Sequence, residues 1–316
     1  MPTYAVGIDI GATNTKIGLV RADAPDGKTP VLVAHATLSS QLHGPNAEPF
    51  IESIAQTVRS LVKEERISRI GVSLCSLINT AHTGAFLSVN APALNGFDIS
   101  AAFTSRFGCP VRVLNDVNAY ALAEYHHGAG QGAQRMLCIA LGTGLAIACI
   151  NDGHLLETWA GVCADAARII LEPAADVSCK AGVRGSAEAL CGTNAIERVG
   201  RQRYGANVSA RDVIEASRAG DDSKAAATMT DIGNHVGHLL AILSPIFFPQ
   251  RIVVTGGTSE AGEPLFNAIR SRYAALIGDY MANLALLETG VARPVDIVKG
   301  ALGPDAAILG SIIQEN

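Results

Sequence analysis

The sequence predicts an α/β fold with a duplicated architecture and a cleft between its two halves. Each half opens with an apolar strand, a turn rich in Gly and Thr, and a second apolar strand. Helical and strand-like patterns then follow one another along each half. Folds of this kind bind ligands at the turns beyond the strand ends. The two glycine turns are therefore the first places to look for a function.

The first half carries the clearest alternation of strands and helices. An apolar, β-branched run over residues 4–10 predicts a buried strand, and the turn at residues 11–15 leads into a second strand of a hairpin. Apolar residues at helical spacing over residues 50–63 predict an amphipathic helix. The remaining predicted elements are strands at residues 31–36, 67–74 and 111–114 and a helix at residues 118–127.

The second half repeats the opening theme. Residues 135–140 and 145–150 predict two strands joined by the turn Gly142-Thr143-Gly144. A long apolar helix is expected over residues 225–243, and a strand over residues 251–255 runs into Gly256-Gly257. The polar, Ala-rich residues 206–224 predict a surface helical excursion.

Composition excludes several classes of protein. Hydrophobic residues make up 48% of the 316 residues and charged residues 17%, which supports a sizeable core and argues against disorder. The net charge is −5, and the basic stripe that is typical of nucleic-acid binders is missing. Seven scattered cysteines without a CxxC pair indicate a reducing cytoplasm, and no signal peptide or membrane span is expected.

The two Gly/Thr turns have the chemistry of a phosphate site. Residues 9–16 read Asp-Ile-Gly-Ala-Thr-Asn-Thr-Lys, so Gly11, Thr13 and Lys16 can offer backbone N–H groups, a hydroxyl and a positive charge. Asp9 at the strand end can hold Mg²⁺, directly or through water. One such turn is equally well explained as an ordinary polar turn. A second one at residues 142–144 strengthens the prediction, because a phosphate chain needs donors from both sides.

Two further segments carry candidate site residues. Asn115-Asp116 lies between a strand and a helix start, where the alternatives are a helix cap and a general base formed by Asp116. Gly256-Gly257 follows a strand and allows the backbone to approach a phosphorylated ligand closely, or it forms a plain turn between strand and helix.

Together, and in this order, these segments resemble the ROK family (repressor, open reading frame, kinase) of the hexokinase–actin-like ATPase superfamily. The resemblance extends over nearly the whole chain, up to residues 302–310. It implies an α/β fold of two ribonuclease H-like, actin-like ATPase domains with an interdomain cleft that holds ATP and Mg²⁺. The expected domains are residues 1–117 with 300–316, and residues 118–299. A homodimer is also implied.

The resemblance assigns expected roles to residues of this chain. Asp116 is the expected catalytic base of a sugar kinase, and the substrate pocket is expected to be built around it. The expected substrate-binding residues are Asn90, Asn115, Asp165, Arg168 and Glu188. The expected residues around nucleotide, phosphates and metal are Asp9, Gly11, Thr13, Lys16, Gly142, Thr143, Gly144, Gly256 and Gly257.

The sugar and zinc region departs from the family pattern. Where the family has Ala-Gly-Glu-x-Gly-His, residues 163–168 read Cys-Ala-Asp-Ala-Ala-Arg, so Arg168 stands in place of a zinc-binding His. The family's Cys-x-Cys-Gly-x-x-Gly-Cys-x-Glu keeps only Cys179 of its cysteines, although Glu188 remains. A structural zinc site needs four ligands, so no zinc is expected. The substrate loop at residues 90–97 has Ala93 where the family has Asn, which leaves the sugar open.

Arg168 has two interpretations. It can pair with an acidic substituent on the sugar, because its planar fork matches a carboxylate or phosphate. Alternatively, it pairs with a neighbour such as Asp165 or Glu172 and replaces the zinc structurally.

Three functions fit these motifs to different degrees. The favoured one is ATP-dependent phosphorylation of a hexose or hexose derivative. A non-catalytic sensor of nucleotide or sugar with the same fold is the alternative. A repressor of the same family is disfavoured, because the first strand begins at residue 4 and leaves no room for a helix-turn-helix domain before it.

Overall fold

A computed structural model describes residues 3–21, 30–40, 46–88 and 91–314. Packing divides the chain into two compact units. The first contains residues 1–132, 148–164 and 301–316, and the second contains residues 133–147 and 165–300. The domain boundaries expected at residues 117 and 299 remain predictions, because this division reflects compactness alone.

Two five-stranded sheets carry the architecture. The first has the order β3-β2-β1-β4-β7 and the second the order β10-β9-β8-β11-β12. The strands are β1 (Tyr4–Ile10), β2 (Asn14–Arg21), β3 (Val31–Ser39), β4 (Ile67–Leu74), β5 (Leu77–Ile78), β6 (Ala85–Leu87), β7 (Val111–Asn115), β8 (Arg135–Leu141), β9 (Leu145–Asn151), β10 (His154–Leu155), β11 (Arg251–Thr255) and β12 (Asp296–Lys299).

The helices follow the sequence pattern only in part. The helices predicted at residues 50–63, 118–127 and 225–243 are found, whereas the helices at residues 99–107, 187–191, 193–204, 263–273 and 279–289 were not predicted. The α-helices are α1 (Glu48–Val62), α2 (Ile99–Phe107), α3 (Asp116–His127), α4 (Ala187–Cys191), α5 (Thr193–Tyr204), α6 (Ala210–Ala219), α7 (Ser223–Phe247), α8 (Glu263–Tyr273), α9 (Asp279–Thr289) and α10 (Ala306–Ser311). None of the helices in the described ranges has the length and apolar character needed to cross a bilayer.

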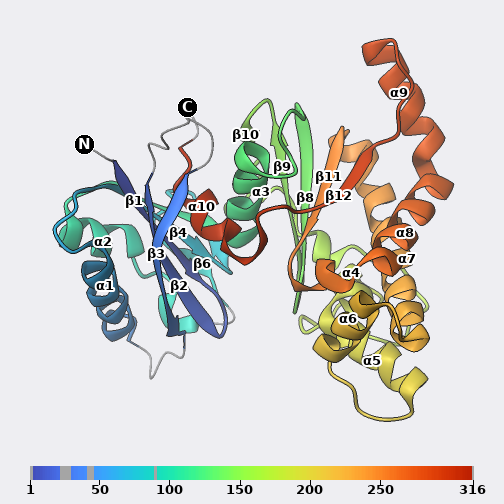
Figure 1. The fold of residues 1–316 in the computed structure, drawn as a ribbon, viewed down its shortest axis with the longest axis horizontal. Coiled ribbons are helices and arrows are strands. Elements are labelled where there is room, and N and C mark those ends of the chain that lie inside the picture. The colour runs from blue at the N-terminus through green and yellow to red at the C-terminus, as the bar shows by residue number, and fades with distance from the viewer. Residues whose placement is uncertain (1–2, 22–29, 41–45, 89–90, 315–316) are drawn as a thin grey trace. The chain divides into compact units, whose positions relative to one another are not determined.

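In the first unit, helices cover both faces of the sheet. α1 and α2 pack on one face, and α10 and α3 lie on the other (Figure 1). Alternate residues of β1 serve the two sides: Val6, Ile8 and Ile10 join the core under α1 and α2, whereas Ala5 packs with α10. This alternation is the period of two that a strand imposes on its side chains.

Glycines bring α10 very close to this sheet. Gly7, Gly18 and Gly71 stand side by side on β1, β2 and β4. A Cβ at Gly7 or Gly71 would overlap the backbone of α10 at Ile308 or Ser311, and a Cβ at Gly18 would overlap the side chains of Leu32 and Ile308. α10 therefore rests almost directly on the sheet backbone, which explains why these three strand positions are glycine.

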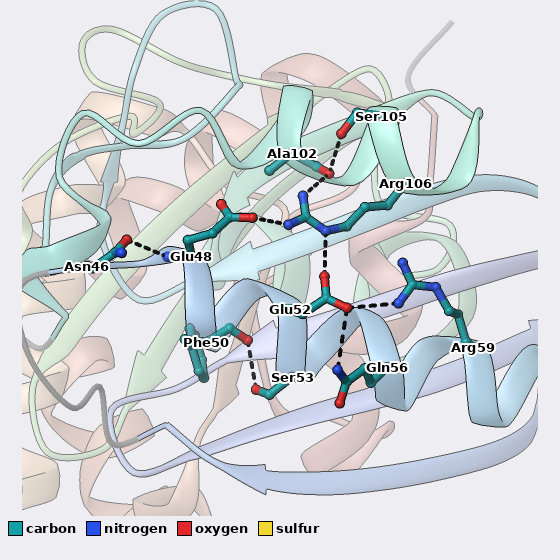
Figure 2. A network of polar contacts seen from close by, with 10 residues as sticks. All are labelled: Asn46, Glu48, Phe50, Glu52, Ser53, Gln56, Arg59, Ala102, Ser105 and Arg106. Atoms are coloured by element: carbon teal, nitrogen blue, oxygen red, sulfur yellow. Dashed lines mark hydrogen bonds and ion pairs between the residues drawn. The ribbon is translucent and has the colours of Figure 1, made fainter.

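An ion network joins α1 to α2 on the surface of the first unit (Figure 2). Arg106 on α2 donates through Nε to Glu52 on α1 at 3.0 Å and also pairs with Glu48. Arg59 reaches the same Glu52 at 3.0 Å. The network holds together two helices that both face the core of this unit.

In the second unit, the strands β8, β11 and β12 run parallel to one another. α7 packs along α8 and also contacts α4, α5 and α6 (Figure 1). The excursion predicted at residues 206–224 contains α6 and the start of α7. Because parallel strands end at the same edge of their sheet, the turns after β8 and β11 come close together.

Candidate active site

The first glycine turn forms the tip of the β1–β2 hairpin. The Gly11 N–H donates to the Asn14 carbonyl at 3.1 Å and closes the turn, while the side chain of Thr13 is exposed. Asp9 and Lys16 face each other directly across the two strands. The sequence thus places a carboxylate and an ammonium group beside an exposed Gly/Thr turn, as a phosphate and metal site requires.

Asp9 is almost buried, with 9% of its surface exposed. Ser73, at the end of the adjacent strand β4, donates a hydrogen bond to its Oδ1 at 2.9 Å. Burial is the largest cause that raises the pKa of Asp9, and the charge of Asp305 adds to it, whereas Ser73 and Lys16 oppose the rise. Lys16 is held in place because its Nζ donates to the Pro304 carbonyl at 2.8 Å.

The sequence left two alternatives open at the Asn115-Asp116 pair, a helix cap and a general base, and the structure shows that the cap is Asn115. Asn115 is the helix cap: its Oδ1 accepts from the Val117 N–H at 3.1 Å, and its Nδ2 donates to the Ser76 carbonyl at 2.8 Å. Both polar groups of Asn115 are thereby bonded within the protein. Asp116 is the first residue of α3, where its carboxylate accepts from the Val117 N–H at 2.9 Å.

The carboxylate of Asp116 has the electrostatics of a general base. Burial, followed by the nearby negative charge of Asp9, raises the pKa of Asp116 to about 6. Hydrogen bonds from the Cys75 thiol and the Val117 N–H oppose this rise. A carboxylate that titrates close to neutrality can accept a proton in its ionised form and release it again, which is the property that acid–base catalysis needs.

In the second unit, two glycine turns meet at one edge of the sheet. Gly142-Thr143-Gly144 follows β8, and Gly256-Gly257 follows β11, which runs parallel to β8. Gly256 has a φ of 88°, and a Cβ there would collide with the carbonyl of Leu141. The contact requires glycine and brings the second turn against the end of β8, where the first turn begins.

Arg168 and Glu188 form an ion pair in the same unit. Arg168 Nη1 donates to Glu188 Oε1 at 2.8 Å and lies 3.1 Å from Cys179 Sγ, while its Nε lies 3.5 Å from Asp165 Oδ2. Among the described residues no group of three or more His, Cys, Asp or Glu side chains could hold a metal ion.

The predicted site residues thus form one cluster in each unit. Asp9, Gly11, Thr13, Lys16, Asn115 and Asp116 gather at the β1, β4 and β7 ends of the first sheet. Gly142, Thr143, Gly144, Asp165, Arg168, Glu188, Gly256 and Gly257 belong to the second unit. Asn90 lies outside the residues that the structure describes.

Three further residues touch the site and escaped the sequence prediction. Ser73 donates to Asp9, and the thiol of Cys75 donates to Asp116. Both come at the end of β4, which lies between β1 and β7 in the sheet, so the predicted strand at residues 67–74 was the available signal. Cys179 stands out in the sequence as the remaining cysteine of the family's pattern, but its contact with Arg168 could not have been predicted from spacing, because an Arg–Cys pair follows no motif.

The ROK family pattern matches residues 5–313. The chain is 28% identical to a glucokinase of Thermotoga maritima, over 98% of this chain and 97% of that protein. It is 25% identical to the DNA-binding transcriptional repressor Mlc of Escherichia coli, over 81% of this chain and 65% of the repressor.

Among solved structures, a ROK family glucokinase from Streptomyces griseus, in complex with glucose and AMPPNP, matches with a TM-score of 0.78 and 26% identity. The match covers 98% of this chain and 97% of that one. This likeness confirms the predicted α/β class and its two actin-like domains.

Proposed function

The chain belongs to the ROK family, and from this premise we propose that it transfers the γ-phosphate of ATP to a hydroxyl of a hexose or hexose derivative. The observation that carries the proposal is the pairing of Asp116, whose pKa is raised to about 6, with Asp9 of the first phosphate turn close enough for their charges to interact. A base and a metal-binding carboxylate at neighbouring strand ends are the groups that phosphoryl transfer to a hydroxyl requires.

Asp116 acts as the base in this proposal. Its carboxylate accepts the proton of the attacking sugar hydroxyl as the new O–P bond forms and the bond to the leaving ADP breaks. Asn115 positions it, because the cap that begins α3 fixes the backbone on which Asp116 is carried. The Cys75 hydrogen bond further restrains the carboxylate.

Asp9 fits a magnesium ion that keeps most of its waters. Magnesium sites at nucleotides use one or two carboxylates, water and phosphate oxygens, and Asp9 offers one carboxylate at a strand end with Asp116 and Asp305 contributing negative charge nearby. Neutralisation of the phosphate charge is the chemistry that a bound magnesium ion supplies. Lys16 supplies positive charge beside the same turn.

The second unit contributes the remaining groups. The turns at residues 142–144 and 256–257 offer backbone N–H groups to nucleotide and phosphates. Glu188, Asp165 and Arg168 contribute to the sugar side, and Asn90 is proposed to join them. The glucokinase relatives support a hexose as the class of substrate, and the glucokinase bound to glucose and AMPPNP supports ATP as the donor.

A screen of sugars with coupled ADP detection tests the proposal. Neutral hexoses, amino sugars and sugar acids are supplied with ATP and Mg²⁺, and phosphate transfer is confirmed by mass spectrometry of the product. We expect turnover with at least one hexose. A chain that binds ATP and a sugar in calorimetry but turns over none of the panel would instead be the non-catalytic sensor.

A further inference from the structure

A single guanidinium group connects three segments of the second unit. Arg168 ends the short turn Ala166–Arg168, Cys179 lies in the glycine-containing loop that follows, and Glu188 stands in the first turn of α4. Nη1 of Arg168 lies 2.8 Å from the Glu188 carboxylate and 3.1 Å from the Cys179 sulfur. The Arg168 side chain therefore joins its own turn to both the loop and the helix.

These residues do not fit a zinc ion, although the family pattern has one at this place. A guanidinium stays protonated and cannot ligate zinc, and Cys179 is the single thiol that remains from the family's set. Where the family's zinc ligands would converge, Arg168 instead places its own positive charge against a thiol and a carboxylate. The positive charge at this place is therefore that of the Arg168 guanidinium group and not that of a metal ion.

The loop that carries Cys179 keeps its shape through its own backbone. Gly182 and Gly185 have φ angles of 81° and 63°, which suit glycine at tight turns. The Cys179 N–H donates to the Val183 carbonyl at 3.2 Å, and the Gly185 N–H donates to the Val177 carbonyl at 2.8 Å. These bonds lie within the loop, and Arg168 links the loop to the side chain of Glu188.

Glu188 is held from two sides. Its Oε1 accepts from Arg168, and its Oε2 lies over Gly144, where a Cβ on that glycine would come within 2.8 Å. The Glu188 side chain is 16% exposed, so it has little room to choose another position. The Glu188 carboxylate therefore stands between Arg168 and the Gly142-Thr143-Gly144 turn.

We propose that Arg168 takes over the structural task of the family's zinc and is a positioning residue that fixes Glu188 for sugar binding. The role of Glu188 toward sugar rests on the proposed kinase function. The positive charge of Arg168 is already matched by the carboxylates of Glu188 and Asp165, and its Nη1 also donates to the Cys179 sulfur. This favours positioning over the capture of an acidic substituent on the sugar.

Hydrogen–deuterium exchange of the full chain tests the structural part without any need for turnover. In Arg168→Ala we expect the amides of α4 to exchange at least tenfold faster than in wild type. The matched control is Arg184→Ala, an arginine of the same loop that pairs with Asp176. Unchanged α4 exchange in Arg168→Ala, or stoichiometric zinc in chelator-washed wild type, would overturn the proposal.

Kinetics then test the positioning of Glu188. Arg168→Ala should raise the KM for the sugar 10- to 100-fold and change kcat less than threefold, and Arg168→Lys should restore part of the loss. Glu188→Gln should have a similar effect, and the double variant should be no worse than either single one, because Arg168 acts through Glu188.

Two results distinguish a failure of the positioning role from a failure of the proposed kinase function. If Arg168→Ala abolishes a preference for sugar acids while the KM for neutral sugars and the α4 exchange stay as in wild type, Arg168 is a substrate contact and the positioning role is wrong. If wild type phosphorylates no sugar, the proposed kinase function fails, and the exchange experiment still decides whether Arg168 holds α4.

Discussion

Asp116 has a pKa close to neutrality because burial and the charge of Asp9 both disfavour its ionised form. The same two causes that cost energy in the folded protein make the carboxylate a competent proton acceptor. Asn115 is the opposite case, since its Oδ1 caps α3 and its Nδ2 donates to the Ser76 carbonyl, so that both of its polar groups are bonded within the protein. In the proposed function, the adjacent pair therefore consists of a positioning residue, Asn115, and a base, Asp116.

The pH dependence of turnover follows from this pKa. The ionised carboxylate is the active form, so kcat/KM should rise with pH, pass half of its maximum near pH 6, and level off above about pH 7. The rate at pH 5 should be about a tenth of the plateau, as expected for one titrating group. Steady-state assays in buffers of constant ionic strength measure the profile; a rate that does not vary between pH 5 and 8 would contradict it.

The same pKa also predicts how the free energy of unfolding depends on pH. The stability should fall as the pH rises, whereas the activity should increase. A carboxyl whose pKa is raised on folding contributes stability below its unfolded pKa and loses that contribution as pH rises through the folded value near 6. Asp116→Asn should therefore be more stable than wild type at pH 8, by about 1–3 kcal/mol, and the gain should vanish near pH 4. Urea unfolding at the two pH values measures the difference, and equal gains at both would show that the charge of Asp116 is not the cause.

At the residue scale the sequence indicated which candidate site residues lie near one another better than it indicated their hydrogen-bond partners. Asp9, Lys16 and Asp116 stand in motifs with fixed spacing, so their neighbourhood could be inferred. Ser73 and Cys75 reach the site only because β4 lies between β1 and β7, and strand order is not written in local spacing. The partners of Arg168 depend likewise on contacts between segments that are distant in sequence.

At the scale of elements, α10 connects the sheet to the helix that begins with Asp116. It lies on Gly7, Gly18 and Gly71 of the sheet, and Gly310 brings it against the backbone of Ala119 in α3. α10 is therefore packed against β1 on one side and against α3 on the other, and these close contacts fix the distance between the two. A larger side chain at one of these contacts should therefore displace α3, and with it Asp116.

A methyl group at Gly310 tests this coupling. Its Cβ would overlap the Ala119 carbonyl, which is backbone and cannot turn aside. We expect Gly310→Ala to lower the stability by about 1–3 kcal/mol through overpacking. It should also lower kcat by a larger factor than it changes the KM for ATP.

The control for this variant is Gly278→Ala. Gly278 is also helical, and its new Cβ would meet only Ala274 Cβ, at an ordinary distance of 3.4 Å. This variant should be neutral or slightly stabilising. Thermal unfolding and steady-state kinetics of both variants provide the comparison, and a Gly310→Ala enzyme with wild-type stability and kcat would show that α10 does not control α3.

The elements themselves were predictable where the apolar pattern was long and regular. The strands around both glycine turns and the helices α1 and α7 were identified from periodicity, because their apolar residues face a core. α2 was not predicted because its apolar pattern is weak, and α4 because it has only five residues. α5, α8 and α9 were not predicted either. β5 and β6 are two and three residues long, too short for any periodic signal.

For the whole molecule, the duplicated strand–turn–strand opening correctly indicated two related units with a glycine turn in each. The order of motifs along the chain was informative because each motif follows a strand, and strands of this fold end at a common edge. The identity of the sugar, in contrast, could not be predicted from the order of the motifs. It depends on the side chains around Asp165, Arg168 and Glu188, where the chain departs from the family pattern.

Loss of the proton acceptor without loss of binding is the most direct test of the central claim. Asp116→Asn keeps the size of the side chain and an oxygen that can accept from the Val117 N–H. We predict that it binds ATP and the preferred sugar with wild-type affinity in calorimetry, while kcat falls by about 10²–10⁴-fold in the coupled ADP assay. An Asp116→Asn enzyme that turns over at the wild-type rate would contradict the account.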